Sequence, residues 1–322
     1  MEWYKNTGAD LDVVISSRVR MARNIADYPF ASRLDKAPAE EIVQKIKEAA
    51  SDSLNFIDFT KITPAEAASY AEKHYVSPEF VSSDLPRALL LDTETGVAIM
   101  VIEEDHIRLQ CIKAGLALGE AYETACIHDD ILCDNLNIAY DEKLGFLTHC
   151  PTNLGCAMRA SAMLFLPALT SSNKIKQLAA YLPKIGVAMR GIYGEGSGAD
   201  GCMYQVSNQK TLGASEAETL ERLTEIICQI VAMERGERVS QKNTSGDKME
   251  DTAYRALGIL KHARLMSSAE FMKLLADLRL GVAMGYINDL PYEKLSDLMI
   301  SAGGAGERGR AAFLQKSLAK NF

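Results

Sequence analysis

Five arginines and two glutamates in this chain have types and spacings that suit the handling of a phosphate group. They are Arg18, Arg20, Arg108, Arg159 and Arg190, with Glu104 and Glu195. An arginine is charged at any ordinary pH, and its planar guanidinium binds phosphate oxygens through paired hydrogen bonds. Fixed positive charge beside carboxylates suits phosphoryl transfer to a nucleophile that must lose a proton. This combination is the first indication of function.

Each of these positions also has a simpler explanation when it is taken alone. Arg18 and Arg20 alternate along an extended segment and share one face, which is also typical of a solvated edge strand. Arg159 stands in an apolar stretch, where a long aliphatic stem can be covered while its charge stays in water. Glu104 lies in an acidic turn that directly ends an apolar strand, and a rigid scaffold often displays functional residues at such a place.

Composition limits the classes of protein that the chain can belong to. It has 322 residues, 48 % of them hydrophobic, so it can bury a sizeable core. The net charge of −8 argues against general nucleic-acid binding. Seven cysteines without C-x-x-C spacing favour reduced thiols in the cytoplasm. The start of the chain has no signal-peptide pattern, and no run of about 20 apolar residues predicts a membrane span.

The apolar periodicity predicts an α+β protein. Helices are expected over residues 38–50, 64–75, 117–138, 156–166 and 215–235. Strands are expected over residues 87–91, 97–102, 106–112, 146–149, 184–192 and 202–207. A hairpin signal at residues 92–96 indicates that the sheet is at least partly antiparallel. Thr152 or Asn153 is expected to cap the helix over 156–166.

The character of the chain changes near Gly236. Residues 240–246 read as a polar linker, and everything beyond them reads as helices. These helices are expected over residues 247–264, 268–278, 291–300 and 307–320. We therefore predict a catalytic-type domain over residues 1–238 and a small helical domain over residues 239–322.

A glycine-rich stretch at residues 191–201 contains the pattern G-x-G-x-x-G. A dinucleotide site would need a helix after this pattern, whereas residues 202–207 read as a strand. A mobile lid over a substrate is favoured, because glycine permits closure and close backbone approach. The chain has no P-loop motif, and it lacks the H-R-D and D-F-G motifs of eukaryotic-type protein kinases.

Several of these motifs, taken in order, carry a family resemblance. The chain resembles the phosphagen (guanidino) kinase superfamily and, within it, the bacterial protein-arginine kinases of the McsB type. The matching stretches are residues 16–24, 103–108, 146–155, 190–196 and 207–209. They extend over about residues 11–235. The resemblance implies a mostly antiparallel sheet flanked by helices, with a small C-terminal helical domain.

The resemblance also implies separate roles for the site residues. The five arginines look like the set that clamps the phosphates of ATP, which would be bound with Mg²⁺. Glu104 looks like the catalytic carboxylate, Glu195 like its partner on a closing lid, and Cys150 like a thiol or thiolate beside the guanidinium. The chemistry agrees, since a guanidinium with a pKa above about 12 is a poor nucleophile until a carboxylate orients it and accepts a proton.

The same resemblance points to arginine within a protein as the acceptor. Metabolite guanidino kinases have a helical domain before the strand that carries the arginine pair, and a domain needs at least about 50 residues. Here that strand begins near Val13, so we expect the domain to be absent and the site to be more open. The alternatives are a small-molecule guanidino kinase and an inactive phosphoarginine-binding adaptor. Intact Glu104 and Glu195 argue against the adaptor.

The C-terminal helices resemble those of McsB-type kinases, with one departure. The family's R-D-x-x-R-A motif belongs to a phosphoarginine-binding pocket, to which Glu307 and Arg310 would contribute here. Gly306 stands where the first arginine is expected. By resemblance, the partners are protein substrates with exposed arginine, a zinc-finger activator, a Clp-type unfoldase and a heat-shock repressor, in a stress response. A cytoplasmic homodimer is the matching expectation.

Overall fold

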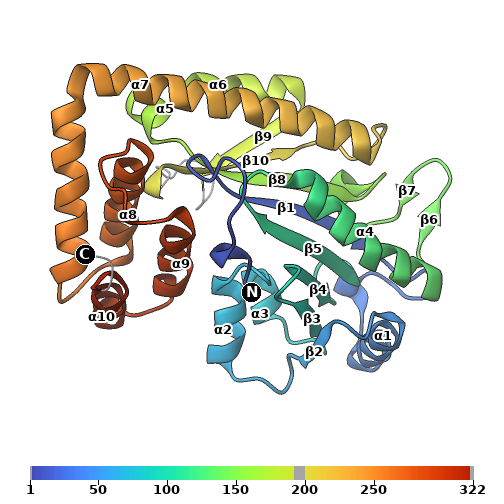
Figure 1. The fold of residues 1–322 in the computed structure, drawn as a ribbon. Helices are drawn as coiled ribbons and strands as arrows, with labels where there is room; N and C mark the ends of the chain where they lie inside the picture. Colours follow the sequence, from blue (N-terminus) through green and yellow to red (C-terminus); the bar gives the residue numbers. More distant parts are fainter. Residues whose placement is uncertain (1, 192–199, 320–322) are drawn as a thin grey trace.

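The computed structural model describes residues 2–191 and 200–319, and its main feature is an eight-stranded sheet (Figure 1). The strands of this sheet are β1 (Val14–Arg23), β2 (Asn55–Asp58), β3 (Ala88–Asp92), β4 (Val97–Val101), β5 (Ile107–Ala114), β8 (Met158–Phe165), β9 (Val187–Gly191) and β10 (Met203–Asn208). Their order is β2-β3-β4-β5-β1-β8-β10-β9, and every neighbouring pair is antiparallel. The antiparallel sheet expected from the hairpin signal is therefore confirmed.

Helices pack on both faces of this sheet and extend beyond its edge. They are α1 (Lys36–Ala49), α2 (Pro64–Glu72), α3 (Pro78–Ser82), α4 (Leu118–Asn135), α5 (Pro167–Ser171), α6 (Ile175–Tyr181), α7 (Glu216–His262), α8 (Ser268–Ala283), α9 (Tyr292–Gly303) and α10 (Glu307–Leu318). A two-stranded hairpin of β6 (Tyr140–Asp141) and β7 (Gly145–Phe146) projects from the sheet. Figure 1 shows α7 running along the sheet and then bending toward the C-terminal helices.

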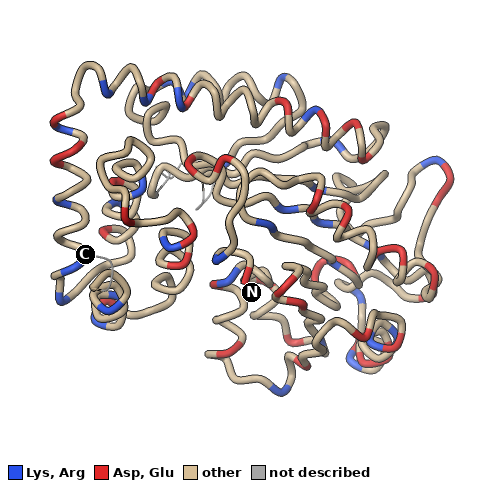
Figure 2. Tube along the Cα trace, viewed as in Figure 1, with Lys and Arg blue, Asp and Glu red and all other residues tan. Residues whose placement is uncertain are grey.

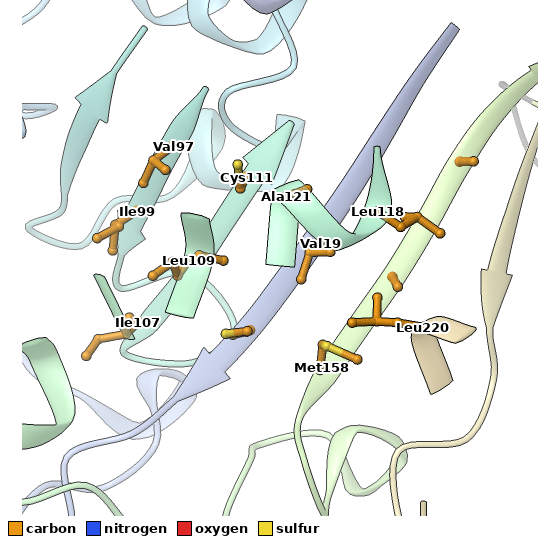
Figure 3. Packing of buried hydrophobic residues seen from close by; sticks show 14 of the residues in the cluster. Val19, Val97, Ile99, Ile107, Leu109, Cys111, Leu118, Ala121, Met158 and Leu220 are labelled. Atoms are coloured by element: carbon orange, nitrogen blue, oxygen red, sulfur yellow. The ribbon is translucent and has the colours of Figure 1, made fainter. Parts of the chain in front are cut away.

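One face of the sheet is apolar and carries the main hydrophobic core. Val19 of β1, Leu109 of β5 and Met158 of β8 are all fully buried. They pack against α4, which supplies Leu118, and against the first part of α7, which supplies Leu220 (Figure 3). Because side chains alternate between the two faces of a strand, the residues between these apolar positions lie on the opposite face.

The opposite face changes character from one side of the sheet to the other. Over β3 and β4 it is apolar, where Leu89 and Met100 pack with Tyr75 and Phe80 under α2 and α3. Over the strands from β5 to β9 it carries polar and basic side chains. Figure 2 shows basic residues on these strands as well as on the surrounding helices.

The C-terminal helices form a second hydrophobic cluster that includes residues of the sheet. Phe271 and Leu275 of α8 share this cluster with Ile15 of β1 and Phe165 of β8. Arg279 of α8 is also fully buried, and its Nη2 donates to the carbonyl oxygen of Leu11 at 2.5 Å. The C-terminal helices are therefore packed directly on one edge of the arginine-bearing face.

The helix expected over residues 156–166 is wrong, and the expected helix cap fails with it. Residues 156–166 are not a helix, because Met158–Phe165 forms β8 between β1 and β10. Alanine, methionine and leucine favour helix locally, but pairing on both sides overrides that preference. Thr152 and Asn153 consequently cap no helix and lie in a short 3-10 turn. The strand expected over 146–149 is limited to Gly145–Phe146.

The polar stretch over residues 240–246 is not a linker, because it lies inside α7. The helix is interrupted only at Ser245, whose φ of −145° departs from helical geometry. Polar residues suit both a linker and a solvated helix, so composition could not separate the two. The division of the chain at residues 238 and 239 stays a prediction, and it falls in the part of α7 that precedes the kink at Ser245.

A buried carboxylate on α7 ties the helix to the sheet. Glu234 is fully buried, and it accepts hydrogen bonds from the backbone N–H groups of Ala168 and Leu169 at 3.1 and 3.0 Å. It also accepts from Arg238 Nε at 2.8 Å. Arg238 in turn donates to the carbonyl oxygen of Phe165 at the end of β8.

Replacing Glu234 with Ala should lower the free energy of unfolding by about 3–5 kcal/mol, because it leaves Arg238 Nε and the backbone N–H groups of Ala168 and Leu169 buried without an acceptor, and only Asp12 then pairs with the Arg238 charge. Chemical denaturation of the purified protein measures this loss. Glu221→Ala, on an exposed position of the same helix, is the control and should change stability by less than about 0.5 kcal/mol. Equal stabilities of the two variants would contradict the structural role of Glu234.

Candidate active site

The strand register places all five predicted arginines on one face of the sheet. Arg20 of β1 lies directly opposite Arg159 of β8, and Arg18 lies two residues from Arg20 along the same strand. Arg108 of β5 pairs with Ala22, two residues further along β1. Arg190 of β9 belongs to the same face, because it pairs with Gln205 of β10, and Ser207 two residues on pairs with Ser161 of β8. Sequence positions far apart thus form one basic surface.

The same alternation explains why a further arginine of β1 does not belong to this set. Arg23 lies an odd number of residues from Arg20 and therefore faces the core side. There its Nη2 donates to Asp129 of α4 at 2.6 Å, and its guanidinium stacks over Phe146. Arg23 is thus neutralised within the fold, whereas Arg18, Arg20 and Arg159 on the other face have no carboxylate partner among the described residues.

The basic surface has few anionic partners among the described residues. Glu103 forms an ion pair with Arg108, and no other ion pair of these residues joins a carboxylate to Arg18, Arg20 or Arg159. The Nε atoms of Arg20 and Arg159 are buried without a hydrogen-bond partner. Buried cations are ordinarily paired, so this set is built for an anion that comes from outside the chain.

The pKa values of these arginines reflect the same crowding. Burial lowers the pKa of Arg18 to about 10, and the nearby charges of Arg108 and Arg159 act in the same direction. Burial and three neighbouring arginines lower the pKa of Arg20 well below its ordinary value. Both side chains lie at the floor of a cleft, surrounded by protein yet still in contact with solvent. A polyanion bound there would relieve the repulsion.

The acidic turn between β4 and β5 separates the roles of its two glutamates. Glu103 is nearly covered, pairs with Arg108 and accepts a hydrogen bond from Ser77 at 2.7 Å. Burial opposes ionisation of Glu103, but Arg108 and several hydrogen bonds outweigh it and lower the pKa. Glu104 is 42 % exposed, and its Oε1 lies 3.6 Å from His149 Nδ1. Glu104 therefore remains free to meet a ligand.

Backbone geometry fixes this turn. Ile102 has a φ of 64°, which is uncommon for a β-branched residue, and its backbone N–H donates to the carbonyl oxygen of His106 across the turn at 2.9 Å. Asp105 is buried and accepts from Asn24 Nδ2 at 2.6 Å and from the backbone N–H of His149 at 2.7 Å. Asp105 thus links the turn to the segment that carries Cys150.

A cavity of about 190 Å³ brings the predicted catalytic residues together. Glu104 and Cys150 line it with Arg20, Arg108 and Arg159. The sulfur of Cys150 lies 3.0 Å from the hydroxyl of Thr152, in the 3-10 turn that replaces the expected helix cap. Carboxylate, thiol and three guanidinium groups therefore meet around one space.

A second cavity, of about 390 Å³, lies further along the same face of β1 and shares no lining residue with the first. Arg18 and Ser16 of β1 line it, together with His74 after α2 and residues of the C-terminal helices. Burial and the charge of Arg18 lower the pKa of His74 to about 4, so its ring is neutral at physiological pH. The ring lies 6.3 Å from that of Trp3.

Three predicted residues do not join this site in the described structure. Glu195 lies outside the described residues. Glu307 is exposed on α10, and Arg310 is almost fully buried there. The Nε, Nη1 and Nη2 atoms of Arg310 donate to the carbonyl oxygens of Ala302, Met266 and Gly303 at 3.0, 2.7 and 2.9 Å. In this structure Arg310 therefore joins the C-terminal end of α9 to the segment that precedes α8.

Sequence reasoning missed several residues that shape the site. Glu103 stands beside Glu104, and the residue types alone could not say which of them faces the cavity. Asp105 lies in one of the stretches that resemble the family, but no role could be predicted for it. Its role depends on a hydrogen bond from the backbone N–H of His149, which only the fold brings close. His74 had no signal, since only the fold brings the end of α2 beside β1.

No group of three or more histidine, cysteine or carboxylate side chains that could hold a metal ion occurs in the part of the chain that the structure describes. In the same part, no helix is long and apolar enough to cross a membrane.

Residues 38–237 match the family described as ATP:guanido phosphotransferase, C-terminal catalytic domain, and residues 246–321 match the protein-arginine kinase McsB C-terminal domain. The chain is 40 % identical over 329 residues to the protein-arginine kinase of Clostridium kluyveri, covering 96 % of this chain and 95 % of that protein. The chain belongs to the protein-arginine kinase family. A second family member, from Caldanaerobacter subterraneus subsp. tengcongensis, is 41 % identical, and the match covers 90 % of this chain and 88 % of that one.

Solved structures confirm the fold of this family member. The duplicated taurocyamine kinase of Schistosoma mansoni with bound transition state analog components has a TM-score of 0.63 at 22 % identity. The match covers 79 % of this chain but only 39 % of that kinase. Lombricine kinase has a TM-score of 0.61 at 23 % identity, and the match covers 71 % of this chain and 68 % of the lombricine kinase chain. At such identities the likeness establishes the guanidino kinase fold alone.

Replacing Arg20 with Met should leave the stability of the ligand-free protein unchanged or raise it, because it removes one of several buried, unpaired like charges. In the wild type, tripolyphosphate at 100 times its dissociation constant should stabilise the fold by about 2.7 kcal/mol. Thermal melts with and without this anion measure both effects. A clearly destabilised Arg20→Met, or an equal response of the variant to tripolyphosphate, would argue against an anion site at Arg20.

Proposed function

We propose that this chain transfers the γ-phosphoryl group of ATP to arginine side chains of proteins. The observation that carries this proposal is the row of arginines on one face of the sheet, in which Arg18, Arg20 and Arg159 have no carboxylate partner among the described residues. This row leads to a cavity lined by Glu104 and Cys150. Membership of the protein-arginine kinase family supports the identity of the acceptor.

The order of residues along β1 gives the direction in which ATP lies. Ser16 lines the larger cavity, Arg18 the boundary, and Arg20 and Ala22 the smaller cavity. At about 3.3 Å per residue, this track is about 20 Å long. The γ-phosphate lies at the Arg20 end, where Arg108 and Arg159 reach it. The nucleoside lies in the larger cavity, where the neutral ring of His74 suits contact with a planar base.

Magnesium is proposed to arrive as part of the substrate, MgATP. Mg²⁺ prefers several waters and phosphate oxygens to an all-protein cage. This agrees with the described residues, in which no group of ligating side chains could hold a metal by itself. The ion would then offset phosphate charge from its own side, while the arginines act from the face of the sheet.

The smaller cavity suits deprotonation of the acceptor. Glu104 orients the incoming guanidinium through paired N–H···O hydrogen bonds and accepts the proton that leaves it. The nitrogen then forms a bond to the γ-phosphorus as the bond from that phosphorus to the β–γ bridging oxygen breaks, and ADP leaves. Cys150 contacts the same guanidinium. Glu195, outside the described residues, is expected from the family resemblance to be the second carboxylate.

The wider role of the reaction is also a proposal. By family resemblance, phosphorylated proteins pass to a Clp-type unfoldase in a cytoplasmic stress response, and a zinc-finger activator and a heat-shock repressor take part. A homodimer through the C-terminal helices belongs to the same set of expectations, as does a phosphoarginine pocket at Glu307 and Arg310. The hydrogen bonds of Arg310 to three carbonyl oxygens weaken the support for that pocket.

Incubation of the protein with MgATP and an unfolded acceptor protein should yield acid-labile phosphate on arginine, which mass spectrometry under non-acidic conditions detects. Free arginine in a parallel reaction should remain unmodified. Transfer to free arginine alone would favour a small-molecule guanidino kinase. Binding of phosphoarginine without any transfer would favour an adaptor.

Glu104→Gln should reduce the rate of phosphoryl transfer by a factor of about 100 or more, because the amide cannot accept the guanidinium proton. The dissociation constant for MgATP should change little, since Glu104 lies at the acceptor end of the track. Rapid-quench kinetics and calorimetry measure the two quantities. The control is Glu142→Gln, on the exposed turn between β6 and β7. Wild-type turnover in Glu104→Gln would exclude its role as the base.

A further inference from the structure

The larger cavity has two walls that come from different parts of the chain. Ser16, His74, Ser161 and Gln205 belong to the sheet and the segment after α2. The facing wall comes from the C-terminal helices, and consists of Ser268, Phe271 and Met272 of α8 with Met299, Ile300 and Gly303 of α9. A molecule in this cavity therefore touches both the sheet and the C-terminal helices.

We propose that α8 and α9 form one wall of the nucleoside half of the ATP cleft, so that the C-terminal helices contribute directly to nucleotide affinity. The proposal rests on the proposed function, because the direction of ATP along β1 decides which end of the molecule enters this cavity. It assigns to α8 and α9 a share of ATP binding in addition to any role in recognising proteins.

The position of the cavity supports a nucleoside as its occupant. Its boundary is Arg18, which lies on the same face of β1 as Arg20 and only two residues away. The reacting phosphate must lie near Glu104 and Cys150, at the other end of this track. A triphosphate that spans the arginines therefore directs its nucleoside past Arg18 into the larger cavity.

The size and chemistry of the cavity agree with that occupant. Its volume of about 390 Å³ is in the range of small-molecule sites. Methionines line both walls, with Met163 and Met203 from the sheet and Met272 and Met299 from the helices. Thioether sulfur makes favourable contacts with aromatic rings and adapts to their shape, as an adenine base requires. A few hydroxyl and amide groups among these apolar side chains can fix the orientation of the nucleoside.

The helical wall is held firmly against the sheet. Phe271 is fully buried in a cluster that also contains Ile15 and Phe165 of the sheet. Met272 packs against the turn at Gly201, just before β10. Arg279, further along α8, donates to the carbonyl oxygen of Leu11. These contacts make α8 a fixed part of the cleft.

Two variants reduce the space in the cavity from the helical side without cutting into the core. Gly303 lines the cavity, and a Cβ atom added there meets nothing within 4 Å, so Gly303→Leu can fold normally. Ser268 lines the cavity on the exposed first turn of α8, where Ser268→Phe adds a ring. The matched controls are Gly258→Leu, which also meets nothing within 4 Å, and Ala269→Phe, which is exposed and outside the cavity.

Calorimetry of the full-length protein with MgATP and, separately, with tripolyphosphate tests the proposal. In Gly303→Leu and Ser268→Phe, the dissociation constant for MgATP should rise about tenfold. That for tripolyphosphate should stay within about twofold, because this ligand needs only the arginines. Both controls should bind both ligands as the wild type does, and circular dichroism and thermal melts confirm that all variants are folded.

The outcomes separate this proposal from the proposed function. If the wild type phosphorylates arginine but the two cavity variants bind MgATP as tightly as their controls, the helical wall plays no part in nucleotide binding and the proposal is wrong. Equal weakening of both ligands would also overturn it, since the substitutions would then act on the arginines. A raised KM for the protein acceptor with unchanged MgATP binding would assign the cavity to the acceptor instead.

Discussion

The central physical constraint on this structure is electrostatic. Several arginine charges lie together on one face of an antiparallel sheet, and their burial and mutual repulsion cost free energy. Arg18, Arg20 and Arg159 are crowded at the floor of a cleft, and burial and mutual repulsion lower the pKa values of all three. The fold tolerates this because the other face of the same strands carries the main core of the protein. Stability thus comes from one side of the sheet and phosphate recognition from the other.

Much of the site could be predicted from residue types, but its geometry could not. The alternation of Arg18 and Arg20 required only that the segment be extended, and β1 confirms it. Arg159 is different, because the residues around it favour a helix, and only pairing with β1 and β10 places it opposite Arg20. Local propensity cannot report a strand that is stabilised by pairing with distant segments, of which β1 lies more than a hundred residues earlier in the chain.

The acidic turn shows a second limit of reading a sequence. Adjacent carboxylates differ by their partners, and all of these partners except Arg108 come from distant segments. Glu103 is taken up by Arg108 and Ser77, whereas Asp105 is taken up by Asn24 and the backbone of His149. The Glu104 side chain stays exposed and can contact a ligand. The helical character of the C-terminal part was predictable from periodicity. Its packing on the edge of the site was not, because that packing depends on the kink of α7 at Ser245, which the polar residues 240–246 do not reveal.

The pairing of β1 with both β5 and β8 has a consequence for how this protein can vary. Along a strand the side chains alternate, so the deletion of one residue exchanges the two faces for everything beyond it. In β1 such a deletion would turn Val19 toward the cleft and drive an arginine into the core. Length changes should therefore be tolerated in turns such as the one between β6 and β7, while β1 and its two neighbours keep a fixed number of residues. Alignments of related sequences should be anchored on these three strands.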